Sequence, residues 1–325
     1  MQSPKAIDTD LAPRGLRFSV SVREAGTALG LALIVLIFGL LSPFFLTTRN
    51  LLEVLEQSSI NACVAVGMTL VIVTGGIDLS VGSTAALAAV IGASALVAHV
   101  PIVLALLLTV GVGAGAGLVN GALVAFAGLQ PFIVTLGTLS LYRAAALIYT
   151  GGNPILGIPN GFRGIFTSAL AGIPTPVILV AVVAGAGWTV LRLTPLGEWL
   201  LAVGGNEEAA RVSGVPIPSA KVVTYMISGG LAAIAALVLV AWLGAADPTL
   251  GNLWELQAIA ASAIGGASLL GGKGSIVGSV LGAVILGAMS NGLTLLNVQA
   301  FYQLLATGLI IIAAMLIDRV TRGSR

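Results

Sequence analysis

The sequence is poor in charge: Asp, Glu, Lys and Arg together make up 8% of its 325 residues. Soluble domains usually have about 25% charged residues, so this chain cannot cover a water-facing surface. Hydrophobic residues reach 58%. Most of the molecular surface is therefore expected to face lipid rather than water.

Cysteine and histidine are almost absent. Cys63 and His99 are the single members of their kinds, so the sequence predicts no intramolecular disulfide and no Cys/His metal site. Cys63 stands in an apolar stretch and is expected to be a small buried hydrophobe. The formal net charge of +2 comes without a basic patch, which gives no indication of nucleic-acid binding.

Long apolar runs are abundant, and a bilayer needs about 20 apolar residues per helix. The chain reads as a polar tail (1–25), a membrane domain (26–317) and a second tail (318–325). We predict an all-α polytopic membrane protein with about ten transmembrane helices. Re-entrant paths for the Gly-rich stretches 74–83 and 265–275 would lower that count by one or two. The apolar runs are 26–46, 60–74, 80–98, 101–128, 131–150, 175–193, 219–246, 256–270, 275–294 and 299–317.

The distribution of positive charge predicts an orientation. With the N-terminus inside and ten crossings, eleven of the fourteen Lys and Arg residues fall on the cytoplasmic side. Positive residues concentrate on that side of membrane proteins. We therefore expect a multi-pass protein of the bacterial inner membrane with both termini cytoplasmic.

Two internal patterns concern helix packing. The segments TGGIDLSVGS (74–83) and LGGKGSIVGS (270–279) are identical at five of ten positions, which predicts an internal parallel repeat. Glycine also recurs every fourth residue in two ladders, a spacing that lets a neighbouring helix approach closely. The ladders are Gly113, Gly117, Gly121 and Gly274, Gly278, Gly282.

A polar insert at 194–218 predicts a short, well-capped helix between two spans. Asn206 suits the N-cap, and Glu207 and Glu208 follow it, where the helix dipole favours negative charge. Arg211 comes near the other end. Gly214 suits the left-handed position that ends a helix, and Pro216 prevents its continuation.

Within this insert, Glu208-Ala209-Ala210 and, after three residues, Gly214 resemble the Glu-Ala-Ala…Gly signature of ABC importer permeases. Five motifs together resemble the ribose/xylose/arabinose-type monosaccharide permeases, and the hydrophobic layout extends the resemblance to nearly the whole chain. The motifs are TGGIDLSVGS (74–83), PFIVTLGTLSLYR (131–143), YTGGNPI (149–155), GGNEEAARVSGV (204–215) and IGGASLLGGKGSIVGSVLGA (264–283).

The resemblance implies a permease subunit that translocates a monosaccharide. Its implied partners are a second permease copy, a separate ATP-binding cassette subunit and a periplasmic or tethered sugar-binding protein. The insert would be the coupling helix that docks on the ATPase, through Gly205, Asn206, Glu207, Glu208, Ala209, Ala210, Arg211 and Gly214. The chain lacks the G-x-x-x-x-G-K-[ST] phosphate loop. We therefore expect a transport subunit that is not an enzyme and binds no cofactor itself, with ATP used by the partner.

Three further groups of residues are candidate sites. Asp78 and Ser80 precede an apolar run, where they would cap a helix, or else Asp78 is a functional carboxylate at membrane depth. Arg143 lies inside an apolar run and would pair with Glu53 or Glu56, or snorkel to the interface. The outer segment 151–174 either docks the binding protein or forms a plug over the pore; its polar side chains are Asn153, Asn160 and Arg163.

Three alternative functions remain at this point. A branched-chain amino acid importer shares the broad permease architecture. An ion-coupled carrier would require several carboxylates deep in the spans, and a passive channel would leave the capped helix without a purpose. The sequence does not identify the sugar, and it does not decide between a homodimer and a heterodimer.

Overall fold

The computed structural model describes residues 22–299, 301–309 and 312, and the regular secondary structure of this part of the chain is helical apart from one hairpin of two-residue strands. The predicted tail 318–325 and most of 1–25 lie outside the described residues. The helices are α1 Val22–Leu41, α2 Thr48–Val73, α3 Val81–Val97, α4 Ile102–Ala125, α5 Pro131–Thr150, α6 Asn160–Thr167, α7 Thr175–Leu193, α8 Pro195–Gly205, α9 Glu207–Val212, α10 Ile217–Leu243, α11 Trp254–Ile264 and α12 Ile276–Leu295, and the hairpin pairs β1 Ala169–Leu170 with β2 Ile173–Pro174.

Seven of the described helices are long and apolar enough to cross a membrane: α1, α2, α4, α5, α7, α10 and α12. This confirms an all-α polytopic membrane protein. The structure does not confirm the count of ten. The run 80–98 forms a helix of only 17 residues and the run 256–270 one of only 11, and the predicted span 299–317 lies partly outside the described residues.

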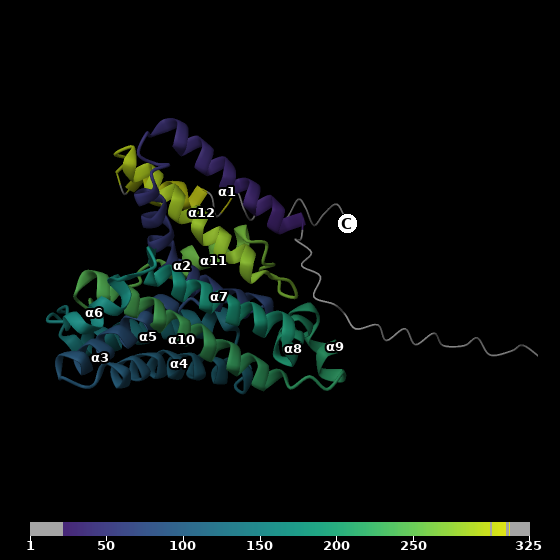
Figure 1. Cartoon of the computed structure of the whole chain (residues 1–325). Coiled ribbons are helices and arrows are strands. Elements are labelled where there is room, and N and C mark those ends of the chain that lie inside the picture. The colour runs from purple at the N-terminus through teal and green to yellow at the C-terminus, as the bar shows by residue number, and fades with distance from the viewer. Residues whose placement is uncertain (1–21, 300, 310–311, 313–325) are drawn as a thin grey trace, which may run out of the picture.

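The long helices run alongside one another (Figure 1), and two short elements mark the ends of the molecule. We call these the α6 end and the α9 end. Helices α2, α10 and α12 are mostly buried, with α2 the most buried of the seven, whereas less than a third of α4, α5 and α7 is buried. Helix α10 packs on α2, α3 and α4, and α12 packs on α1, α2 and α11.

Small residues allow these helices to touch backbone to backbone. A Cβ on Gly113, Gly117 or Gly121 would overlap backbone atoms of α10, and a Cβ on Gly278 or Gly282 would overlap those around α11. The packing role predicted for the two ladders is therefore confirmed, except that Gly274 lies against a Val73 side chain.

Two connections turn into the core instead of remaining at the surface. Residues 74–80 follow α2 and place Asp78, only 1% exposed, against Ser228 near the middle of α10. Residues 244–253 follow α10 and bring Gly251 into backbone contact with Gly82, at the start of α3. Helices α3 and α11 therefore start inside the molecule, which explains why they are short.

The two connections share a local conformation. Each contains a glycine with positive φ near its start, Gly75 at 81° and Gly244 at 67°. In the first, Asp78 Oδ1 accepts from the amide and hydroxyl of Ser80 at 3.0 and 2.7 Å. In the second, Asp247 Oδ1 accepts from the amide and hydroxyl of Thr249 at 2.7 and 2.6 Å. The matching segments therefore form the same aspartate turn.

The segments of the expected parallel repeat also meet, because Gly271 lies against the backbone of Gly75. Their surroundings differ, however. Helix α11 packs along α12, whereas α3 packs on α4, α10 and α5 rather than along α2. The structure therefore does not confirm the parallel repeat.

The close packing of α4 on α10 can be tested with two alanine substitutions. Gly117→Ala should destabilise the protein by about 1–3 kcal/mol, because the added methyl group overlaps the Tyr225 carbonyl. Gly115→Ala is the matched control on the same helix, since nothing lies within 4 Å of its Cβ position. Thermal unfolding in detergent measures both, and equal melting temperatures would contradict the packing account.

Candidate coupling site and polar centre

Helix α9 has the capped form that the sequence predicted. Asn206 is its N-cap, and its side-chain oxygen accepts from the Ala209 amide at 2.9 Å. Glu207 and Glu208 occupy the first turn and Arg211 the last. Gly214 has φ 79°, a conformation that strains most other residues. Helix α10 then begins directly after Pro216.

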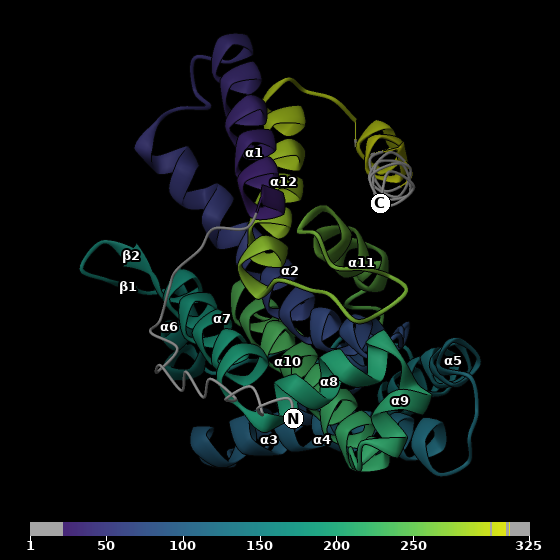
Figure 2. The ribbon, with the colours of Figure 1, turned by 90° about the vertical axis from the view of Figure 1, so that its right-hand side faces the viewer.

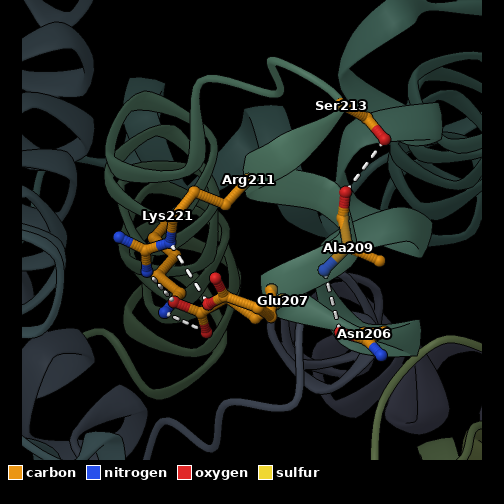
Figure 3. A network of polar contacts seen from close by, with 7 residues as sticks. Asn206, Glu207, Ala209, Arg211, Ser213 and Lys221 are labelled. Atoms are coloured by element: carbon orange, nitrogen blue, oxygen red, sulfur yellow. Dashed lines mark hydrogen bonds and ion pairs between the residues drawn. The ribbon is translucent and has the colours of Figure 1, made fainter.

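An ion-pair network ties α9 to α10 (Figure 3). Glu207 contacts Lys221 Nζ at 2.8 Å and Arg211 Nη2 at 3.4 Å. The Lys221 side chain is only 16% exposed, so this pair is better protected from solvent screening than a surface pair. Glu208 is 81% exposed and lies 3.8 Å from Arg211 Nε. The two adjacent glutamates therefore differ, with Glu207 facing α10 and Glu208 facing outward.

Apolar contacts complete the attachment of α9. Ala210 is 4% exposed and packs with Val203 of α8 and Ile217 of α10. On the opposite face, Val212 is 83% exposed. A cavity of about 470 Å³ separates α9 from the loop between α4 and α5, and its lining includes Glu207, Arg211 and Lys221. Sequence reasoning missed both residues: Lys221 lies outside the recognised signature, and Val212 is one of its unspecified positions.

Asp78 is at the centre of a buried polar network. Ser228 of α10 donates to its Oδ2 at 3.1 Å, in addition to the two bonds from Ser80. Asn120 of α4 donates to the Ser80 hydroxyl at 2.8 Å, and Tyr142 of α5 donates to Asn120 Oδ1 at 3.4 Å. This network links four separate parts of the chain.

The network corrects the helix-capping interpretation of Asp78 and Ser80. Ser80 does occupy the N-cap position of α3, but its side chain makes no capping hydrogen bond. Its hydroxyl donates to Asp78 instead. Asp78 itself is buried, because the 74–80 connection enters the core.

Arg143 has different partners from those expected. Its Nη1 donates to the carbonyl oxygens of Pro248 and Leu250 at 2.7 and 2.9 Å. Glu255 and Asp247 are the carboxylates that attract the guanidinium electrostatically. Glu53 instead pairs with Arg49. The pairing with Glu53 or Glu56 was wrong, because α5 packs on α3 and α4. Nearby, the hydrogen bonds from Thr249 lower the pKa of Asp247.

Known proteins match this chain in sequence over most of its length. A family model described as "Branched-chain amino acid transport system / permease component" matches residues 50–315. The chain belongs to this permease family. The ribose import permease of Bacillus subtilis is 43% identical over 306 residues, which cover 94% of this chain and 95% of that protein.

Two of the relatives that are 42% identical come from Escherichia coli K12. Its ribose import permease is 42% identical over 301 residues, covering 91% of this chain and 93% of its own. Its D-allose transport system permease is 42% identical over 305 residues, covering 93% and 94%. No solved structure matches the permease.

The segment 151–174 lies at the α6 end of the permease. Asn153 and Asn160 are exposed there. Arg163 is half-buried instead, and its Nε donates to the Ala241 carbonyl at 3.1 Å in the last turn of α10. Ile155 also forms a β-bridge with Ala246. Of the three predicted surface residues, Arg163 thus has a structural partner within the chain.

The N-cap of α9 can be tested through its amide protons. Asn206→Ala should destabilise the helix by about 0.5–2 kcal/mol, because Ala offers no acceptor for the Ala209 amide. Asn206→Asp keeps an acceptor and is the control. Hydrogen exchange at 207–212 should become faster in the alanine variant alone. Equal exchange in both variants would show that the cap does not stabilise α9.

The buried aspartate has an equally direct test. Asp78→Ala leaves the Ser80 and Ser228 hydroxyls without their acceptor and should cost about 1–3 kcal/mol. Asp247→Ala removes the matching but more exposed turn and should cost less. Melting temperatures in detergent compare the two. A larger loss for Asp247→Ala would contradict the central role of Asp78.

Proposed function

We propose that the chain is the membrane-spanning permease subunit of an ATP-binding-cassette importer and that it translocates a monosaccharide. The supporting observation is the identity of about 42% to ribose and allose import permeases over nearly their entire length. The family model's description mentions branched-chain amino acids, but these relatives are named for sugars. They favour the sugar importer over the amino acid importer.

The remaining alternatives fit the structure less well. An ion-coupled carrier needs several carboxylates in the transport region, yet among the described residues Asp78 is the only buried one. Its oxygens already accept hydrogen bonds from Ser80 and Ser228. A passive channel needs no capped helix held by ion pairs at one end, so α9 argues against it.

In this proposal α9 is the coupling helix, and the α9 end faces the cytoplasm with both termini. A separate subunit hydrolyses ATP and docks on the outward-facing surface formed by Glu208 and Val212, while the Glu207 side attaches α9 to α10. The permease itself needs no cofactor. The nucleotide and the docked sugar-binding protein each favour one state of the pathway, because each binds that state more tightly.

At the opposite end, Asn153 and Asn160 belong to the proposed docking surface for a sugar-binding protein, and a second permease copy completes the pathway. The predicted parallel repeat is replaced by an inverted one. The order α2, α3, α4 then corresponds to α10, α11, α12. Three observations support this correspondence: the two aspartate turns, the Gly82–Gly251 contact, and the packing of α3 on α4 and α10 as α11 packs on α12 and α2.

Purification and transport assays test the proposed function together. The tagged permease, purified from its host in mild detergent, should retain an ATP-binding subunit. In vesicles, with the binding protein present, it should import ribose or allose rather than leucine when ATP is supplied. Uptake of leucine alone, or sugar uptake without ATP, would contradict the proposal.

Two variants place the coupling site. Glu208→Lys combined with Gly214→Pro should reduce ATP-driven uptake by about tenfold or more, because it reverses the exposed charge and breaks the helix end. Ser213→Ala, which removes only an exposed hydroxyl bonded to the Ala209 carbonyl, is the control. Full transport by the double variant would show that α9 is not the coupling helix.

A further inference from the structure

Three chain segments meet in backbone contact directly beside α9. They are the end of α2 at Val73–Gly75, the end of α8 at Gly204–Gly205, and the loop Ser268–Lys273 between α11 and α12. A Cβ on Gly204 would overlap the Val73 carbonyl oxygen, and one on Gly271 would lie 2.7 Å from Gly204 O and 2.9 Å from Gly75 N. The Gly272 amide also donates to the Val73 carbonyl at 2.9 Å. We call this contact the glycine junction.

The junction is continuous with α9 on one side. Gly205 ends α8, and the next residue, Asn206, caps α9. The loop that joins α11 to α12 lies beside α8 in the view onto this end of the molecule (Figure 2). A cavity of about 300 Å³ opens at the same place and is lined by residues 204–205 and 268 and 270–273. Any displacement of α9 along α8 therefore presses on the other two segments.

On its other side the junction leads to the polar centre. No helix lies between Val73, the last residue of α2, and Asp78 in the 74–80 connection. The Ile77 carbonyl accepts from Thr135 of α5 at 3.1 Å and from Tyr225 of α10 at 3.4 Å. Asp78 accepts from Ser228. A shift of Val73–Gly75 thus acts directly on α5 and α10.

We propose that the glycine junction transmits the motion of α9 to the 74–80 connection, with Gly204 as its positioning residue. The three segments act as one rigid unit, because backbone contacts without side chains leave no flexible atoms to absorb a displacement. This inference rests on the proposed function, since it assumes that α9 is driven by an ATP-binding subunit.

Two alanine substitutions provide the test. Gly204→Ala forces a methyl group between α8 and α2, whereas Gly185→Ala, in α7 and outside the junction, meets nothing within 4 Å. In reconstituted complexes, Gly204→Ala should keep the ATP-binding subunit and its ATP hydrolysis but reduce sugar imported per ATP by about tenfold. Gly185→Ala should leave that ratio unchanged. An unchanged ratio in Gly204→Ala, or loss of the ATP-binding subunit from it, would overturn the inference.

A cross-link tests rigidity without inserting a methyl group. Gly205→Cys and Lys273→Cys both line the 300 Å³ cavity, and the native Cys63 is buried and out of reach of a bis-thiol reagent. A rigid junction should tolerate the cross-link with uptake retained, whereas loss of uptake on cross-linking would overturn the proposal. ATP-driven uptake by the unmodified complex is the reference; its absence would reject the proposed function itself.

Discussion

Direct contact between backbones is the interaction on which this structure depends. Helices in lipid gain little from burying apolar side chains, so close van der Waals packing must supply the association energy. Glycine makes this possible at three levels here. Gly117 brings the backbone of α4 against α10, and Gly82 at the start of α3 contacts Gly251 in the connection after α10. Gly204 brings the end of α8 against the end of α2 in the junction beside α9. Adding one methyl group at any of these points would force backbones apart.

The same contacts explain how polar groups survive in the core. Connections that enter a membrane protein are tolerated only where protein surrounds them and satisfies their polar atoms. Asp78, Ser80, Asn120 and Ser228 satisfy one connection, and Arg143 satisfies the carbonyls of the other. Each of these five polar residues thus has a partner from another segment of the chain.

This dependence on distant partners explains which features the sequence could predict. The cap of α9 and its end at Gly214 depend on neighbours a few residues away, and the packing role of the glycine ladders follows from their four-residue spacing; the structure confirms these features. The partners of Arg143 and the burial of Asp78 depend on connections turning inward at positive-φ glycines, which periodicity does not reveal. The matching of Asp78 with Asp247 was missed because an identical turn, not sequence identity over a long stretch, relates them.

The stability of α9 has the same physical origin. A helix of six residues is too short to be stable in water by itself. Its Asn206 cap, the buried Ala210 and the Glu207–Lys221 pair fix it to α8 and α10, while Glu208 and Val212 stay exposed. One face is thereby attached to the membrane helices and the other remains exposed. A helix attached in this way can transmit a force that a flexible loop would absorb, which makes the firmness of its attachment as important as its signature sequence.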